Sequence, residues 1–325
     1  MKNSAVRPIW CIAVLLAVAA AAQEVPVVLQ VEVENQVRYG GVVEPSQVAT
    51  SPVPVTSSIR QLNFNRPIVI GDVIAVNGSP ARGAWVSLEN NIRLTPTPTV
   101  PLPGGAISDA MQPAVSIHSL EFLKPDGDPI GTILGLGAVG SPTKGWAIVG
   151  GTGAFLGAKG AIRATANPGV RTTSQAEDPS MRRVNGGGRG TYVIHLIPMF
   201  RPEVLITPSG PAIAHSNDFS LVTASKPAAA GEILSLFATG LGPTRPGVDP
   251  GQPFPPNPLA AVTSPVEVTV NGRSAEVLAA VGFPGAVDGY QVNFRVPPDT
   301  PRGPATVQVS SAWIAGPAVS IAVQR

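Results

Sequence analysis

Gly-Gly-Thr-Gly-Ala-Phe-Leu-Gly-Ala-Lys-Gly, residues 150–160, is the stretch that says most about how this chain folds. A glycine-dense loop that ends in lysine is typical of phosphate sites. A dinucleotide loop, however, needs a third glycine where Leu156 stands, and a P-loop needs Ser or Thr after the lysine, whereas Lys159 is followed by glycine. No amphipathic helix follows, and strand-like alternation continues through residues 161–165. We therefore predict a strand-turn-strand unit that binds no phosphate, with Phe155 and Leu156 packed in a core.

The rest of the sequence favours β-structure. Its 36 prolines and 35 glycines divide the chain into runs too short for helices. Two hairpins are predicted, Asp72–Gly78 with Gly83–Leu88 and Val266–Gly272 with Ala275–Val277, because Asn-Gly supplies the positive φ angles of a tight turn. Residues Lys124–Pro129 have turn chemistry throughout. The fold class predicted is all-β.

Residues 1–22 have the pattern of a secretory signal peptide. Lys2 and Arg7 precede an apolar run from Ile9 to Val18, and Ala19–Ala22 supplies small residues for cleavage. A retained membrane anchor is the alternative, but the run is shorter than the roughly 20 residues of a spanning helix. We therefore predict a secreted protein, located in the periplasm, outside the cell or at the cell surface, with no membrane attachment after cleavage.

Composition excludes several classes of protein. The one cysteine, Cys11, lies in the leader, so disulfides, thiolate metal sites and cysteine nucleophiles are not expected beyond it. Without Lys2 and Arg7 the number of basic residues falls from 22 to 20, which equals the number of acidic residues. A chain with no excess of Lys and Arg is a poor match to a phosphate backbone, so nucleic acid is not an expected partner.

Two segments, Thr95–Pro103 and Asn167–Gly190, have the composition of linkers or open loops. The composition turns to proline, serine and alanine after Pro198, which places a domain boundary near Arg201. The length suggests about two domains. We predict one domain over residues 23–200, including an N-terminal extension, and a second over residues 201–325.

The first domain resembles the allene oxide cyclase and dirigent barrel superfamily. The residues that carry the resemblance are Ile148–Gly160 and Gly190–His195, and the similarity covers roughly Val115 to Pro198. It implies an eight-stranded antiparallel β-barrel whose lumen is either packed or holds one small ligand. The acidic, arginine and aromatic lumen residues of the plant members find no match here, so the resemblance implies no catalytic residues.

The second domain resembles a different family. Gly231–Thr244, Val266–Asn271, Gly289–Pro298 and a final Val-Gln-Val strand are similar to the carboxy-terminal domain of secreted acidobacterial proteins of the Solibacter type. The spacing is also similar to that of immunoglobulin-like IPT/TIG modules. The resemblance implies an immunoglobulin-like β-sandwich that serves as a surface or assembly module.

The residues that carry chemistry are few. The chain has three histidines, and nothing is spaced to supply the three or four ligands of a zinc site. The acidic residues that a calcium loop starting at Asp126 would need are missing, and there is no G-x-S-x-G elbow. We expect no metal, no cofactor and no catalytic residues. The candidates for ligand contacts in a barrel lumen are His118, Glu121, Tyr192 and His195. Alternation puts His118 and Glu121 on opposite strand faces, and likewise Tyr192 and His195, so only one of the second pair can face a lumen.

Three functions remain open. The first hypothesis is a secreted or cell-surface structural or interaction protein, whose partner is another protein or a cell-surface component; it predicts a packed lumen. The second is a barrel that binds a small apolar ligand, which needs an apolar lumen with one or two convergent polar groups. The third is a dirigent- or cyclase-like enzyme, which also needs an ionisable group within reach of that lumen; His118 and Glu121 are the nearest.

Overall fold

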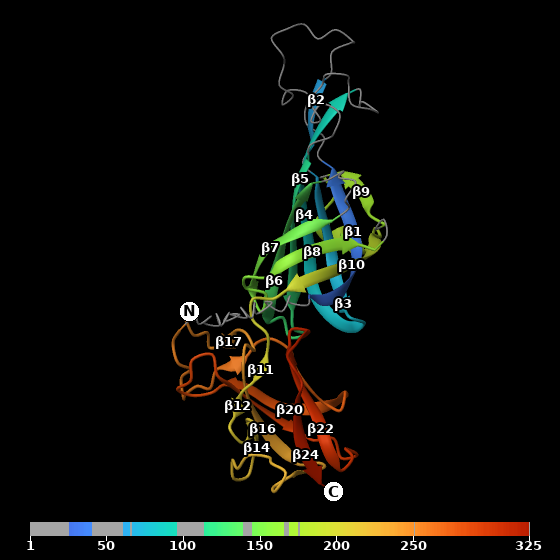
Figure 1. Ribbon diagram of the computed structural model, residues 1–325. Coiled ribbons are helices and arrows are strands. Elements are labelled where there is room, and N and C mark those ends of the chain that lie inside the picture. Colours follow the sequence, from blue (N-terminus) through green and yellow to red (C-terminus); the bar gives the residue numbers. More distant parts are fainter. Residues whose placement is uncertain are drawn as a thin grey trace, which may run out of the picture.

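Figure 1 shows the computed structural model, which describes residues 26–40, 61–65, 67–95, 114–138, 145–165, 169–174, 176–249 and 251–324. Within these ranges the regular structure is β-strand, apart from one short 3-10 helix, η2 (Pro179–Arg183). The all-β prediction is confirmed. The predicted signal peptide and most of the predicted linker at 95–103 lie outside the described residues. In the described ranges no helix is long and apolar enough to cross a membrane.

Eight antiparallel strands close into a barrel, in the order β10-β8-β7-β6-β5-β4-β3-β1, because β1 pairs back with β10. Closure leaves none of these strands as an open edge. The antiparallel barrel prediction is confirmed. Two short strands add to it: β2 pairs with β4, and β9 runs parallel to the end of β1. The bounds are β1 (Val27–Gly40), β2 (Gln61–Asn65), β3 (Ile68–Val76), β4 (Ser79–Thr95), β5 (Ala114–Leu123), β6 (Pro129–Ala138), β7 (Trp146–Gly153), β8 (Lys159–Ala164), β9 (Arg171–Ser174) and β10 (Gly188–Ile197).

The glycine-rich stretch is the connection between β7 and β8. Residues 154–157 form the turn, and Gly153 has a positive φ of 60° that L side chains rarely adopt. Phe155 is fully buried in the barrel core, as predicted. Leu156 was predicted to be buried too, and that prediction is wrong: its side chain is 55% exposed. The two residues follow one another in a turn, so when Phe155 faces the barrel its neighbour faces away from it.

The segment predicted as a linker or open loop, 167–190, is held by ion pairs where it is described. Arg171 makes two hydrogen bonds to Glu177, at 2.5 and 2.9 Å. These contacts hold the pKa of Glu177 at about 2. Arg182 and Arg183 both pair with Asp72 on β3. The sequence pattern did not show this because Asp72 lies more than a hundred residues away.

A second group of strands follows from residue 203 and lies below the barrel in Figure 1. Its main sheet has the order β11-β16-β21-β20-β19-β22-β24-β15, while β12 and β13 pair separately. The bounds are β11 (Glu203–Val204), β12 (Ile206–Thr207), β13 (Gly210–Pro211), β14 (Ile213–His215), β15 (Ala228–Ala229), β16 (Ile233–Thr239), β17 (Thr244–Arg245), β18 (Ala261–Val262), β19 (Val266–Val270), β20 (Arg273–Gly282), β21 (Tyr290–Arg295), β22 (Gly303–Ser311), β23 (Ile314–Ala315) and β24 (Val319–Gln324).

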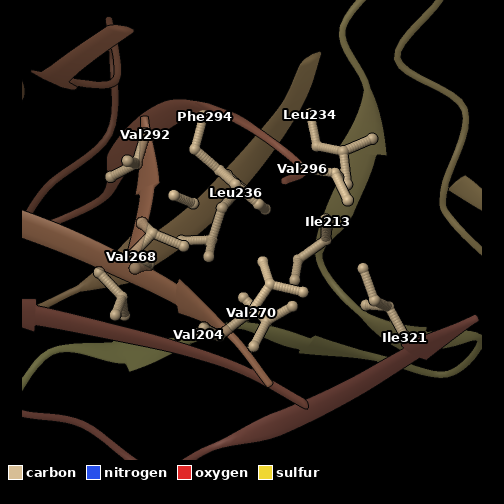
Figure 2. Packing of buried hydrophobic residues seen from close by; sticks show 14 of the residues in the cluster. Val204, Ile213, Leu234, Leu236, Val268, Val270, Val292, Phe294, Val296 and Ile321 are labelled. Atoms are coloured by element: carbon tan, nitrogen blue, oxygen red, sulfur yellow. The ribbon is translucent and has the colours of Figure 1, made fainter. Parts of the chain in front are cut away.

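This second group has a core of its own. β20 pairs with β19 through its first residues and with β21 through the rest, so it connects two sets of strands. Figure 2 shows side chains of both sets pointing toward one another, among them Leu236 of β16, Phe294 of β21 and Val268 of β19. We call this group the C-terminal part. Its strands begin after Arg201, where the domain boundary is predicted.

Both predicted hairpins are present. Asn77 and Gly78 connect β3 to β4 with φ angles of 51° and 76°. Asn271 and Gly272 connect β19 to β20 with φ angles of 50° and 75°. Asparagine and glycine tolerate this left-handed conformation better than other residues, which is why the sequence signal was reliable here.

Candidate functional site

The pleat of the strands separates the four residues predicted to contact a ligand. His118 on β5 and Tyr192 on β10 are buried inside the barrel, with 2% and 3% of their surface exposed. Glu121 on β5 and His195 on β10 lie on the outer face, with exposed side chains. Because successive side chains of a strand alternate between faces, placing His118 and Tyr192 inside forces the other two outward. Glu121 and His195 are therefore not lumen residues.

His118 and Tyr192 belong to a cluster of aromatic rings inside the barrel. The ring centroids of Trp85 and Tyr192 are 3.7 Å apart. The His118 ring lies 4.1 Å from the ring of Trp146 and 5.6 Å from that of Trp85. Both tryptophans thus contact the histidine. The four rings come from strands β4, β5, β7 and β10 and lie together inside the barrel, with Trp146 only partly buried.

The polar atoms of the cluster are satisfied in part. His118 Nε2 is 2.9 Å from the hydroxyl of Ser116, and the Tyr192 hydroxyl donates to Oε1 of Gln36 at 2.6 Å. His118 Nδ1 and the Ser87 hydroxyl are buried and have no hydrogen-bond partner among the described residues. Burial lowers the pKa of His118 to about 4, so its imidazole is neutral at pH 7. Burial also raises the pKa of the Tyr192 hydroxyl.

Glycines on the inner face show how closely the lumen is packed. Gly137 on β6 lies opposite Ser116 of β5, and a methyl group added to it would stand 2.5 Å from Cδ1 of Trp146. A methyl group on Gly71 of β3 would be 2.6 Å from a methyl of Val33. Carbon atoms in contact are normally about 3.5–4.0 Å apart. A side chain at either position would therefore have to displace its neighbour.

The end of the barrel that faces the C-terminal part is closed by a turn from that part. Ala312 and Trp313 connect β22 to β23 and both have positive φ angles, 48° and 64°. These are costly conformations for residues other than glycine, asparagine and aspartate. Ala312 is fully buried in the barrel core, and the Trp313 ring lies 5.6 Å from that of Phe122, which in turn contacts Phe155 at 5.3 Å. The turn thus serves as a plug of the barrel.

Polar contacts and a pocket surround this plug. Arg245 pairs with Asp128 at 2.6 Å, and Lys124 Nζ donates to the carbonyl of Val262 at 3.4 Å, so side chains of both parts reach across the joint. A pocket of about 480 Å³ lies beside the plug. Its walls include Leu156, Phe200, Leu241, Tyr290 and Ile314.

Among the residues that the structure describes, no three His, Cys, Asp or Glu side chains are close enough to hold a metal ion.

The third histidine, His215, lies in the C-terminal part, where its Nδ1 is 2.5 Å from Oε1 of Glu232. Glu232 Oε2 also accepts from the backbone N–H of Ala229 at 2.7 Å, so this pair ties strands together.

The sequence did not indicate that Trp85, Trp146 and Trp313 contribute their rings to the inside and to the end of the barrel. One signal was available: of the four alternate positions 131, 133, 135 and 137 of β6, which share one face, all but Ile133 are glycine. Three side-chain-free positions on a single face indicate that a large ring packs over it. No comparable signal marks Trp313, because a tight turn between two strands usually contains asparagine or glycine.

The fold and the site define a class: a closed eight-stranded antiparallel barrel with an aromatic lumen, plugged at one end by a β-rich C-terminal part. No protein-family model and no curated protein sequence matches the chain. The two family resemblances therefore stay interpretations of the motifs that carry them.

Proposed function

We propose that this chain is a secreted or cell-surface protein with a structural or interaction role, in which an allene oxide cyclase- or dirigent-like barrel carries an immunoglobulin-like C-terminal module. The observation that supports the proposal is the cluster of large side chains inside the barrel. Trp85, Trp146, His118 and Tyr192 lie together in it, and a methyl group on the inner-face Gly137 would stand 2.5 Å from Trp146. A barrel packed with its own side chains acts through its outer surface.

The rival barrel functions need a lumen that admits a molecule. A ligand-binding barrel needs an enclosed apolar space with a few convergent polar groups. A cyclase-like enzyme needs in addition an ionisable group that reaches its substrate. His118 instead lies against the rings of Trp85 and Trp146, and burial lowers its pKa to about 4. The secreted location is supported by the apolar run from Ile9 to Val18.

A titration with apolar compounds tests the proposal. The Trp313→Phe variant without residues 1–22 emits only from Trp85 and Trp146, so its fluorescence reports on the lumen. We expect no saturable change in emission with a long-chain fatty acid or a small terpene up to about 100 µM, a range in which a built apolar site binds. A saturable change that disappears in Trp146→Phe would overturn the proposal in favour of a ligand-binding barrel.

The pocket beside the plug supports a second candidate function, which is binding of a small apolar molecule between the two parts. Its volume of about 480 Å³ lies within the usual range of ligand sites, roughly 300–1,000 Å³. Leu156 and Phe200 stand at it with more than half of their surface exposed. The same compounds, titrated by calorimetry against wild type and Leu156→Glu, distinguish this site from the lumen, because the substitution affects only the pocket.

A further inference from the structure

We infer that the outer face of strands β3 to β7 is a self-association surface, on which a second copy of this chain docks. The inference rests on the proposed interaction role and names the partner. Seven apolar side chains on this face are exposed by 36% to 59%. We call them the apolar face: Ile68, Leu88, Val115, Ile117, Leu134, Leu136 and Val149.

The apolar face is continuous across neighbouring strands. Ile68 of β3 lies directly opposite Leu88 of β4, and Leu88 lies opposite Ile117 of β5. Ile117 lies opposite Leu136 of β6, which in turn faces Ala147 of β7. Opposite residues on one face of a sheet are about 4.5–5.5 Å apart, so these side chains form one unbroken row.

Charged side chains lie beside the apolar face and not within it: Asp72 of β3 and Glu121 of β5 stand in a neighbouring row, both opposite Ala84 of β4. β6 and β7 contain no charged residue. The second row, next to the first, is also uncharged: Ile70 faces Val86, which faces Ser119, which faces Leu134. An antiparallel sheet that exposes one face to water normally alternates apolar side chains inside with polar ones outside, whereas in these two rows the outward side chains are apolar except for Ser119. The seven side chains of the apolar face carry no charge, so two such faces packed together bring no like charges into contact.

The area fits a pair of copies. Seven large apolar residues exposed to this extent present on the order of 500 Å², at the upper end of what a monomer leaves exposed in one patch. Two such faces packed together remove about 1,000 Å² from water, which is the size at which a biological interface begins. Sheet faces pack on one another at about 10 Å, with their side chains interdigitating, so the geometry of this face suits a second sheet.

The symmetry of a pair singles out Ile117. A twofold interface uses the same patch on both copies, so a residue on the axis contacts its own counterpart. Ile117 is the middle member of the five-residue row from Ile68 to Ala147. We therefore expect the two Ile117 side chains to meet at the centre of the interface.

Sedimentation of the chain without residues 1–22 tests the inference. We expect a dimer at micromolar concentration, and at least about 100-fold weaker association in the double variant Ile117→Lys/Leu136→Glu, because central interface residues carry most of the binding free energy. The two new charges lie opposite each other and form a favourable cross-strand pair, so the barrel should fold. If that variant does not fold, Ile117→Thr/Leu136→Thr retains β-propensity and serves the same purpose. Leu278→Lys, at an exposed apolar position of β20, is the matched control and should remain dimeric.

Cross-linking supplies a second readout. Ile117→Cys should form a disulfide-linked dimer on mild oxidation, whereas Leu278→Cys should not. A chain that stays monomeric up to about 100 µM overturns the inference, as does a dimer that survives the Ile117→Lys/Leu136→Glu change. A monomer that binds vesicles of phosphatidylcholine and phosphatidylglycerol through this face also overturns it. None of these results depends on the lumen, whose ligand titration tests the proposed function separately.

Discussion

Replacing Gly137 by alanine tests the packing of the lumen at one atom. The new methyl group would stand 2.5 Å from Cδ1 of Trp146, about 1 Å inside the normal contact distance. Trp146 cannot retreat freely, because the His118 ring lies 4.1 Å from its own ring. Overpacking of this kind costs about 1–3 kcal/mol, while the lower backbone entropy of alanine in the unfolded chain returns about 0.4–1 kcal/mol. We expect Gly137→Ala to lower the free energy of unfolding by about 1–2 kcal/mol.

Urea denaturation, followed by fluorescence at one fixed protein concentration, measures the effect. Gly150→Ala on β7 is the matched control, because a methyl group there would have no atom within 4 Å, and we expect it to be neutral or slightly stabilising. In Trp146→Leu the space of the indole is vacated, so the cost of Gly137→Ala should largely disappear in the double variant. If Gly137→Ala is as neutral as Gly150→Ala, the lumen has room that the packing argument denies, and the reasoning is refuted.

Three further predictions follow from the same structure. Phe155→Ala should lower the free energy of unfolding by roughly 3–5 kcal/mol while Lys159→Ala changes it little; equal effects in urea denaturation would contradict the strand-turn-strand reading. Burial lowers the pKa of the His118 imidazole from the usual 6.5 to about 4 in the folded chain. Acid therefore favours the unfolded chain, and the folded chain should lose about 3 kcal/mol of stability between pH 6.5 and pH 4. This loss should be absent in His118→Phe. Identical profiles of stability against pH for the two proteins would contradict the burial of a neutral His118. Trp313→Gly relieves a positive φ angle but loses the contact with Phe122, so calorimetry should show a free energy of unfolding lower by about 1–3 kcal/mol. A higher free energy of unfolding would show that the plug does not stabilise the chain.

Local signals in the sequence predicted much of the fold. Asn77-Gly78 and Asn271-Gly272 specify their hairpins because the turn chemistry is contained in the two residues themselves. The stretch 150–160 likewise contains the glycines that its turn requires. Side chains of a strand alternate between its two faces, so the sequence already showed that His118 and Glu121 of β5 cannot both face the lumen, and likewise Tyr192 and His195 of β10.

Features that depend on distant partners were not predictable. Leu156 was expected in the core. Phe155 and Leu156 are consecutive in the turn, so only one of them can face the barrel, and the sequence does not say which. Asp72 orders the segment around Arg182 only because the barrel brings the two together. The insertion of Trp313 into the barrel end depends on how two parts of the chain dock, which no single-segment pattern records. Which of Tyr192 and His195 faces inward was also decided only by the closed barrel.

The central claim, that the chain's own side chains fill the barrel lumen, is tested most directly by X-ray crystallography under xenon pressure. Xenon enters apolar cavities that are large enough to hold it and leaves packed cores empty. The account predicts no xenon atom among the rings of Trp85, Trp146, His118 and Tyr192. A well-occupied xenon site enclosed by these rings would contradict it and would return the barrel to the class of ligand-binding proteins.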